Sequence, residues 1–404
     1  MSILAINSGS SSLKFGLFDA GACEPLLAGD IDWAHGDRER AQLTLRPRDG
    51  QPVTSLLAVP DDFTAAKAAI NAALGSGPHG PHGNSSITLV GHRVVHGGAE
   101  FRHSVLIDAK VKAAIEGLNK LAPLHNPPAL KAIEAAERLL PGVPEVAVFD
   151  TAFFAELPAK AYLYALPYGY YQLWGIRRFG FHGLSHAYCA GRASELLGRA
   201  GCDLRLISCH LGGGCSAAAV RGGVAVATTN GFSPLEGLMM ATRPGSVDPG
   251  ILIHLQRDHG LSLDQIDDAL NRSSGLLGIS GVSSDLAQIE AAAAQGNPRA
   301  RLAFDMFADR VRSAIGALAA TLGGVDALIF TDRVGERSAA LRAAACEGLE
   351  FMGLRLDLER NANCGADADL ARGDSPARIF AIHTREELMI AREARRVLAA
   401  MAGQ

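Results

Sequence analysis

The sequence predicts an α/β protein with two domains, and three observations lead to this expectation. The chain has 404 residues, which is more than one ordinary hydrophobic core accommodates. Segments typical of strands and of helices alternate along it, as in proteins whose helices cover a largely parallel sheet. Several polar residues of interest follow directly after predicted strands, which is where open α/β sheets place their ligands.

Composition and charge favour a globular enzyme over a nucleic-acid-binding or membrane protein. The chain is 48% hydrophobic and 20% charged, with a net charge of −4, which is typical of a soluble globular enzyme. Lysine and arginine are scattered, so we expect no nucleic-acid partner. No apolar run is long enough to span a membrane and no signal peptide is evident, so we expect no membrane association and a cytoplasmic location. Seven cysteines without a CxxC pair suit reduced thiols.

A strand, a turn of small residues and a second strand open the chain. Residues 3–6 form a short apolar run and residues 13–18 form another, with Asn7, Gly9 and four serines near the turn. The tip of such a hairpin exposes backbone N–H groups and hydroxyls, and Lys14 adds a cation, so it could bind phosphate. An ordinary polar hairpin is the alternative, because a Gly/Ser turn is common.

The remaining elements follow from hydrophobic periodicity. The helix expected at residue 127 begins with two prolines, which a first helical turn tolerates. Residues 75–84, rich in Gly and Pro, predict a surface loop. The expected strands are 88–95, 145–149, 204–209, 326–330 and 378–382, and the expected helices are 108–121, 127–140, 248–258, 263–271, 284–295, 298–322 and 385–402.

Two arginines lie in apolar surroundings, where an unpaired guanidinium is costly. Arg93 lies within an apolar strand and Arg243 follows an apolar run. Each therefore requires an anion, which is either a structural carboxylate or a ligand. His125 and His182 lie beside small residues, where a lone histidine is usually structural. Together with a glycine-rich turn, these side chains would suit a site for phosphate and carboxylate groups.

Two further features could take part in such a site. Asp150 follows a predicted strand and could cap a helix or hold Mg²⁺, which binds few carboxylates and otherwise takes water and phosphate oxygens. Three consecutive glycines, Gly212 to Gly214, follow His210 and would let the backbone approach a ligand closely. A plain loop between two strands is the alternative.

Ten short clusters of candidate site residues follow one another along the chain. Examples are Gly-His-Arg-Val-Val-His-Gly-Gly at 91–98, Phe-Gly-Phe-His-Gly at 179–183 and His-Leu-Gly-Gly-Gly at 210–214. This ordered set resembles the acetokinase family, and the resemblance covers essentially the whole chain. The other clusters are at 7–14, 122–127, 149–152, 234–243, 281–285, 330–336 and 384–388.

The resemblance implies an α/β fold of two actin-like, ribonuclease-H-like domains with an active-site cleft between them. The first domain would comprise residues 1–150 with a returning helix at 385–404, and would bind the acyl and phosphate groups. The second, residues 151–384, would bind nucleotide and form a homodimer. The two domains would close on the nucleotide.

The resemblance also implies a reaction, the reversible Mg²⁺-dependent transfer of the γ-phosphoryl group of ATP to acetate, giving acetyl phosphate and ADP. Mn²⁺ is an alternative metal. A carboxylic acid with a pKa of roughly 4–5 is already ionised at neutral pH, so the acceptor needs no general base. The obstacle is one anion approaching another, and catalysis should consist of positioning and charge neutralisation.

The resemblance assigns each role to residues of this chain. The catalytic set is Asp150, Arg93, His182, Arg243 and His125. The acetate site is Arg93, Val95, Leu124, Phe181 and Pro234. The metal site is Asn7, Asp150 and Glu386. The nucleotide site is Asn7, Ser10, Ser12, Lys14, His210, Gly212, Gly213, Gly214, Asp285, Leu286, Arg333, Val334 and Gly335.

This chain departs from the family pattern mainly on the nucleotide side. Gly213 and Arg337 each replace an asparagine, Arg333 replaces a glycine in the loop that holds adenosine, and Ala287 replaces an arginine. We therefore keep as alternatives a propionate kinase and an acetate kinase that uses another phosphoryl donor, such as pyrophosphate. An alternative of another class is a catalytically weak, nucleotide-binding regulatory protein, against which the intact acyl-side residues count.

Overall fold

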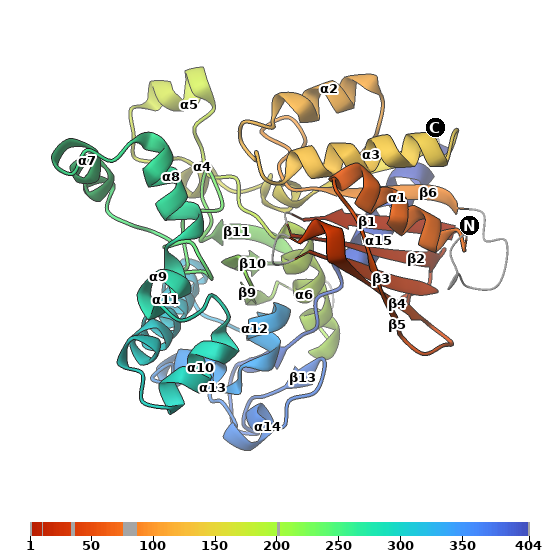
Figure 1. Cartoon of the computed structure of the whole chain (residues 1–404). Coiled ribbons are helices and arrows are strands. Elements are labelled where there is room, and N and C mark those ends of the chain that lie inside the picture. Colours follow the sequence, from red (N-terminus) through yellow and green to blue (C-terminus); the bar gives the residue numbers. More distant parts are fainter. Residues whose placement is uncertain (1, 10, 34–36, 76–86, 200–202, 403–404) are drawn as a thin grey trace. The chain divides into compact units, whose positions relative to one another are not determined.

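The computed structural model describes residues 2–9, 11–33, 37–75, 87–199 and 203–402. By its internal contacts the chain divides into two compact units (Figure 1). The first comprises Met1–Ala155 and Arg385–Gln404, and the second comprises Glu156–Thr384. The first unit is therefore completed by the C-terminal end of the chain.

The first unit is built on an eight-stranded sheet with the order β5-β4-β3-β2-β1-β6-β8-β7. The strands from β5 to β1 are antiparallel, whereas β1 pairs with β6 and β6 with β8 in parallel. The strands are β1 (Ser2–Ser8), β2 (Ser12–Asp19), β3 (Leu27–Asp32), β4 (Ala41–Pro47), β5 (Val53–Leu57), β6 (Ile87–Val94), β7 (Val105–Leu106) and β8 (Glu145–Phe149).

Helices cover both faces of this sheet. Leu4 and Ile6 of β1 belong to a core that includes residues of α1 (Asp62–Ala73) and α3 (Asn126–Leu139). The intervening Ala5 faces the other side, where its neighbour Gly91 lies under α15 (Glu386–Ala402). A Cβ atom at Gly91 would lie 2.7 Å from a methyl of Ile390, so glycine is needed for α15 to approach. The described part of this unit also contains the helix α2 (Ala109–Gly117) and the 3₁₀ turns η1 (Arg38–Arg40) and η2 (Asp150–Phe154).

The second unit is built on a six-stranded sheet with the order β11-β10-β9-β12-β14-β13. Its central strands β9, β12 and β14 are parallel, and β10 pairs antiparallel with both β9 and β11. The strands are β9 (Arg205–Leu211), β10 (Cys215–Arg221), β11 (Val224–Thr228), β12 (Ala327–Thr331), β13 (Ala368–Asp369) and β14 (Arg378–Ala381).

The two faces of β9 differ in chemistry because side chains alternate along a strand. Ile207, Cys209 and Leu211 belong to the core that includes α11 (Pro298–Leu322). Ser208 and His210 point the other way, and both contact side chains of α6 (Gly183–Leu196). A layer of polar groups is therefore buried between the sheet and α6.

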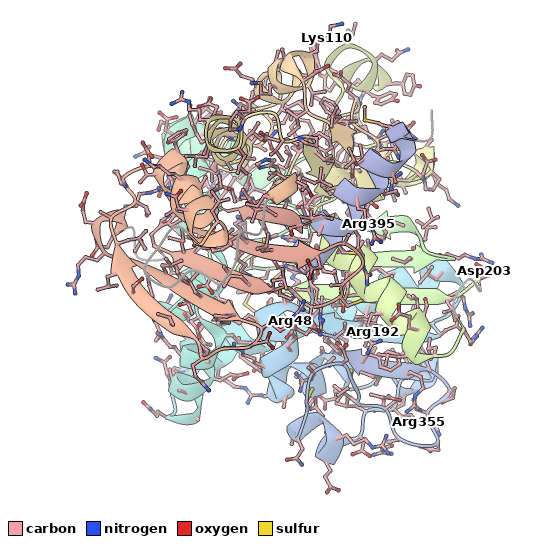
Figure 2. The ribbon with its side chains drawn as sticks, turned by 90° about the vertical axis from the view of Figure 1, so that its right-hand side faces the viewer. Arg48, Lys110, Arg192, Asp203, Arg355 and Arg395 are labelled. Atoms are coloured by element: carbon pink, nitrogen blue, oxygen red, sulfur yellow. The ribbon has the colours of Figure 1, made fainter. Side chains whose placement is uncertain are left out.

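Shorter helices complete the second unit, and charged side chains such as Arg48 and Lys110 of the first unit and Asp203 of the second extend into solvent (Figure 2). None of the helices in the described part of the chain combines the length and the apolar character needed to cross a bilayer. The shorter helices are α4 (Ala159–Tyr162), α5 (Tyr168–Trp174), α7 (Pro249–Asp258), α8 (Leu263–Arg272), α9 (Gly275–Ser280), α10 (Leu286–Ala294), α12 (Asp332–Arg337), α13 (Ala339–Cys346) and α14 (Leu358–Ala362), with the 3₁₀ turn η3 (Glu350–Met352).

The strands and helices expected from periodicity are confirmed to within a few residues. One expectation was wrong. Residues 332–337, expected as part of a loop, form the helix α12, whose C-terminal amide at Ser338 donates to the carbonyl of Val334. The loop was an implication of the family resemblance, whereas here even Gly335 is helical, because one glycine costs a helix only about 1 kcal/mol and does not end it.

Candidate active site

In the first unit, three strand ends bring a buried polar cluster together. Asn7 is near the end of β1, Arg93 is in β6 and Asp150 follows β8. The Arg93 guanidinium donates to Oδ2 of Asp150 through Nε (3.0 Å) and Nη2 (2.6 Å), and to Oδ1 of Asn7 through Nη1 (2.8 Å). The anion that Arg93 requires is therefore, in this structure, the carboxylate of Asp150.

The start of α15 adds negative charge to this cluster. The amide nitrogen of Asn7 donates to Oε2 of Glu386 (2.8 Å) and to Oε1 of Glu387 (3.1 Å). Burial lowers the pKa of Arg93, but the carboxylates of Asp150, Glu386 and Glu387 more than offset it, so the net direction is upward. Three carboxylates face one guanidinium, and the cluster therefore favours an additional cation.

The donor atoms of this cluster suit Mg²⁺. Asp150 and Glu386 are carboxylates and Asn7 offers an amide oxygen, which are the hard ligands that Mg²⁺ takes. Among the described residues, no three His, Cys, Asp or Glu side chains converge closely enough to hold a metal ion by themselves. Mg²⁺ keeps several waters and binds substrate phosphates, so it needs few ligands from the protein itself.

The N-terminal hairpin places the other expected residues of this unit along β2. Lys14 is exposed and pairs with Asn7 across the β1–β2 ladder, and Ser12 is half-buried at the start of β2. Ser10 lies outside the described residues. The expected hairpin is confirmed.

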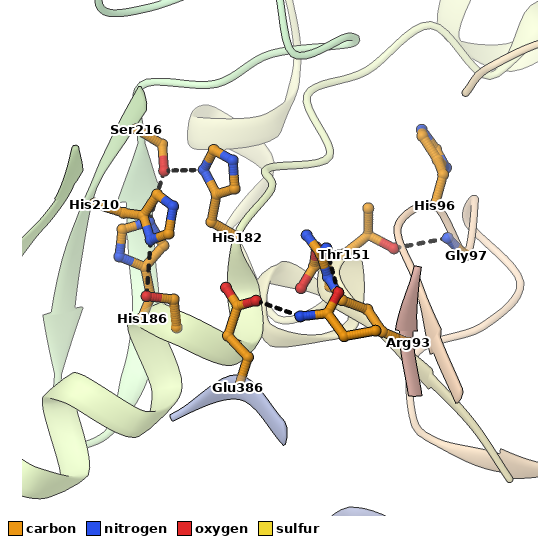
Figure 3. A network of polar contacts seen from close by, with 12 residues as sticks. Arg93, His96, Gly97, Thr151, His182, His186, His210, Ser216 and Glu386 are labelled. Carbon is orange, nitrogen blue, oxygen red and sulfur yellow. Dashed lines mark hydrogen bonds and ion pairs between the residues drawn. The ribbon is translucent and has the colours of Figure 1, made fainter. Parts of the chain in front are cut away.

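The segment after β6 is held by hydrogen bonds to two neighbouring elements. The amide of His96 donates to Oδ1 of Asn126, and Asn126 donates back to the carbonyl of His96. The amide of Gly97 donates to Oγ1 of Thr151 (2.9 Å) (Figure 3). Burial lowers the pKa of His96 to about 4, so this imidazole is neutral at physiological pH. These contacts fix the backbone next to Val95, which is buried.

Two expected residues precede α3. His125 is the N-cap residue of this helix, although its side chain makes no capping hydrogen bond, and it is half-buried. Leu124 is 44% exposed, so in this structure its side chain is not enclosed by other residues of its unit.

In the second unit, the polar layer between α6 and the sheet is a network of histidines and serines. Ser185 and His186 lie in the first turn of α6, and His182 is the N-cap residue of this helix. Nδ1 of His182 and Nε2 of His186 each lie 2.8 Å from Oγ of Ser216 (Figure 3). Nδ1 of His186 lies 2.9 Å from Oγ of Ser208.

His210 joins this network from β9. Its Nδ1 lies 2.8 Å from Oγ of Ser185, and its ring stacks on that of His182 with 4.2 Å between centroids. The β9–β10 register pairs His210 with Ser216. Both strands therefore present polar residues to α6. Burial and the neighbouring His210 lower the pKa of His186 well below its usual value.

The side chains of His182 and Arg243 converge on the glycine-rich turn between β9 and β10. A Cβ atom at Gly214 would lie 3.3 Å from Nε2 of His182 and 3.8 Å from Nη1 of Arg243. Arg243 donates weakly to the carbonyl of Pro234 (3.4 Å) and to the sulfur of Met240 (3.8 Å). Burial lowers its pKa, and no carboxylate within the described ranges forms an ion pair with it. Within the described residues, this guanidinium therefore lacks a compensating carboxylate.

Asp332 also approaches this turn. Its Oδ2 atom lies 3.4 Å from Nε2 of His210 and would overlap a Cβ atom at Gly212. The backbone of Asp332 has a φ of 62°, the left-handed region that non-glycine residues rarely adopt. Such strain is often retained at functional sites.

The structure brings four of the expected nucleotide-site residues together. Asp285, Leu286, Arg333 and Val334 line one pocket of about 140 Å³ between α10 and α12. Nη2 of Arg333 lies 3.4 Å from Oδ2 of Asp285. Gly335 is buried within α12. The arginine that replaces a glycine of the family pattern is therefore part of the pocket wall.

The two expected apolar residues of the second unit lie apart from this pocket. Phe181 is buried just before α6, and Pro234 is half-buried and contacts Arg243 through its carbonyl. Their counterparts Val95 and Leu124 belong to the first unit.

Several residues of the polar layer and the glycine-rich turn are not among those predicted from the sequence. Two patterns in the sequence indicate most of these residues. One is a polar residue at every second position of an apolar strand, and the other is a His-x-x-Ser-His spacing at the start of a helix. The missed residues are Ser185, His186, Ser208, Ser216 and Asp332.

Comparison with known proteins gives consistent matches. The model of the acetokinase family matches residues 2–392. An acetate kinase of Cyanothece sp. is 48% identical over 400 residues, with 97% of each chain covered. The crystal structure of Porphyromonas gingivalis acetate kinase superposes with a TM-score of 0.89 at 41% identity, covering 98% of this chain and 99% of that one. A propionate kinase from Francisella tularensis subsp. tularensis superposes equally well, with a TM-score of 0.89, at 34% identity, with the same coverage.

Proposed function

The chain belongs to the acetokinase family, with its two-domain actin-like α/β fold, and we propose that it is an acetate kinase. It is a phosphotransferase with a carboxyl group as acceptor. In this proposal it transfers the γ-phosphoryl group of ATP reversibly to acetate, giving acetyl phosphate and ADP.

The main support for the proposal is the position of Arg243 and His182 beside the glycine-rich turn. Gly214 has no side chain, and Nη1 of Arg243 and Nε2 of His182 both lie near the position that a Cβ atom would take there. Arg243 has no carboxylate partner among the described residues, so its charge is available to an anion. A phosphoryl group in transfer carries negative charge on its three equatorial oxygens, and donors fixed in advance stabilise that charge most effectively.

We assign the roles in the first unit as follows. Arg93 orients the carboxylate of acetate, and Val95 contacts its methyl group. Asp150, Asn7 and Glu386 would hold Mg²⁺, which would supply positive charge to neutralise the phosphates. Because acetate is already ionised at neutral pH, Asp150 has no proton to remove from it, and its role is to anchor the metal and Arg93.

We assign nucleotide binding to the second unit. The pocket between α10 and α12 accepts the nucleoside, and the glycine-rich turn after His210 lies along the phosphates. Arg333 moves aside from Asp285 to admit the base, because its side chain is 55% exposed and free to take another rotamer. We therefore propose that ATP is a donor, with binding weaker than the family norm.

An assay for acyl phosphate tests this function. Purified protein with Mg²⁺, acetate and hydroxylamine should form acetyl hydroxamate with ATP, and more slowly with propionate in place of acetate. GTP and pyrophosphate should be compared as donors in parallel. Faster reaction with propionate would favour the propionate kinase alternative, for which the Francisella tularensis structure is the precedent. Nucleotide binding without any acyl phosphate would favour a regulatory protein.

We further propose that the protein is a homodimer formed through its second unit. Five large apolar residues in and before α5 are exposed, and a monomer rarely leaves so many together in contact with water. They are Leu166, Tyr168, Tyr170, Leu173 and Trp174. Sedimentation velocity should show a dimer that Leu173→Asp dissociates. Leu358→Asp, at a similarly exposed residue of α14, is the matched control and should leave the dimer intact.

A further inference from the structure

The contacts of the histidine–serine network restrict where its protons can lie. Oγ of Ser216 contacts two imidazole nitrogens, Nδ1 of His182 and Nε2 of His186. A hydroxyl has one proton, so it can donate to one of these nitrogens and must accept from the other. A neutral imidazole also has one N–H and one acceptor nitrogen, so His186 must donate to one of its two serines and accept from the other.

His186 is neutral because it is completely buried, and burial together with His210 lowers its pKa well below the usual value. With His186 neutral, only two arrangements of the chain Ser208–His186–Ser216–His182 satisfy all three contacts. In the first, every hydrogen bond is donated toward His182. In the second, every hydrogen bond is donated toward Ser208.

Ser208 distinguishes the two arrangements. It is fully buried, and in the described part of the chain its hydroxyl has no hydrogen-bond partner besides His186. If Ser208 accepts from His186, its own proton is left in the interior without an acceptor. If Ser208 donates to Nδ1 of His186, every proton of the chain is used. A buried hydroxyl without a partner is costly enough to shift the population about tenfold or more.

We propose that Ser208, His186 and Ser216 form a relay that holds neutral His182 as the tautomer with its proton on Nε2. Ser208 donates to Nδ1 of His186, Nε2 of His186 donates to Ser216, and Ser216 donates to Nδ1 of His182. The proton of His182 is then on the nitrogen that faces Gly214, beside Nη1 of Arg243.

This inference rests on the proposed function for its consequence, not for its geometry. In an acetate kinase, the relay makes His182 a hydrogen-bond donor to the phosphoryl group without requiring it to take up a proton. His186 and Ser216 are positioning residues, because they act through His182. No proton is gained or lost by the relay during transfer.

The tautomer can be measured directly by ¹⁵N NMR on protein labelled at histidine nitrogens. The His182 signals are assigned by their loss in His182→Gln. The relay predicts that neutral His182 carries its proton on Nε2 in the wild type, and that Ser216→Ala gives a mixture of tautomers. A wild-type signal for the Nδ1–H tautomer, or an unchanged tautomer in Ser216→Ala, would overturn the proposal.

Ser185→Ala is the matched control. Ser185 is equally buried and its hydroxyl also contacts an imidazole, but that of His210, which is not a member of the relay. Its removal should leave the His182 tautomer unchanged. Ser216→Thr retains the hydroxyl and should retain the Nε2–H tautomer if it folds.

Kinetics provide the second readout. Ser216→Ala should lower kcat about 10- to 100-fold while the KM values for acetate and ATP stay within about threefold, because the lost hydrogen bond is made in the transition state. The NMR result does not depend on catalysis. Absence of acetate kinase activity with an Nε2–H tautomer would refute the proposed function alone, whereas activity with an Nδ1–H tautomer would refute the relay alone.

Discussion

Removal of Arg93 should destabilise the first unit as well as abolish catalysis. Asp150 is completely buried, and the Arg93 guanidinium donates to it through two N–H groups. Arg93→Ala leaves this carboxylate in the interior without its guanidinium, close to Asn7 and its two glutamates. Breaking a buried ion pair on one side typically costs about 3–5 kcal/mol. This is a large fraction of the roughly 5–15 kcal/mol that stabilises a domain.

The same reasoning predicts partial recovery in a double variant. Asp150→Asn removes the uncompensated charge and keeps the shape of the side chain, so Arg93→Ala/Asp150→Asn should recover about half or more of the lost stability. Arg46→Ala is a matched control, because Arg46 pairs with Asp30 at an exposed position. Exposed ion pairs contribute about 1 kcal/mol or less, and this variant should unfold almost as the wild type does.

The two tryptophans allow the first unit to be monitored separately. Trp33 is buried in the first unit and Trp174 is exposed in the second. In a Trp174→Phe background, the fluorescence change during urea unfolding reports on the first unit. A loss below about 1 kcal/mol in Arg93→Ala, or a double variant no more stable than the single one, would refute the claim that Arg93 compensates a buried charge.

Three further predictions concern the site. Arg243→Ala should lower kcat by about 10²- to 10³-fold, because a donor to the transferring phosphoryl group is lost. The loss of stability should be small, because Arg243 has no carboxylate partner among the described residues, and near-normal turnover would remove Arg243 from the mechanism. Val95→Ala should raise the ratio of kcat/KM for propionate over acetate by roughly 10-fold, and an unchanged ratio would place Val95 outside the acetate pocket. Arg333→Gly should lower the KM for ATP but not for acetate, since the arginine lies in the pocket wall beside Asp285; an unchanged KM for ATP would show that Arg333 does not impede the nucleoside.

The sequence was sufficient to predict the architecture. The short apolar run 145–149, which is buried along its whole length, and the long amphipathic segment 298–322 each indicate one kind of element, and the structure has these elements at the same residues. Short elements with mixed composition, such as α12, were not predicted, because their conformation depends on packing against the sheet rather than on local pattern.

The candidate site was only partly accessible from sequence. The sequence predicts that Arg93 is a buried cation in need of an anion, but its partner Asp150 lies 57 residues away, and a single sequence does not indicate that pairing. Ser208 and Ser216 have no distinctive local pattern beyond their place in apolar strands. Their importance emerges only when the register of β9 and β10 places them against α6.

The most direct test of the proposed reaction follows the oxygen atoms of acetate. The purified protein is incubated with Mg²⁺, ATP and ¹⁸O-labelled acetate, and the products are observed by ³¹P NMR. If the acetate carboxylate attacks the γ-phosphorus, the acetyl phosphate signal should show the isotope shift of an ¹⁸O atom bonded to phosphorus, and ADP should be the nucleotide product. Acetyl phosphate without the shift, or formation of AMP and pyrophosphate, would contradict the mechanism.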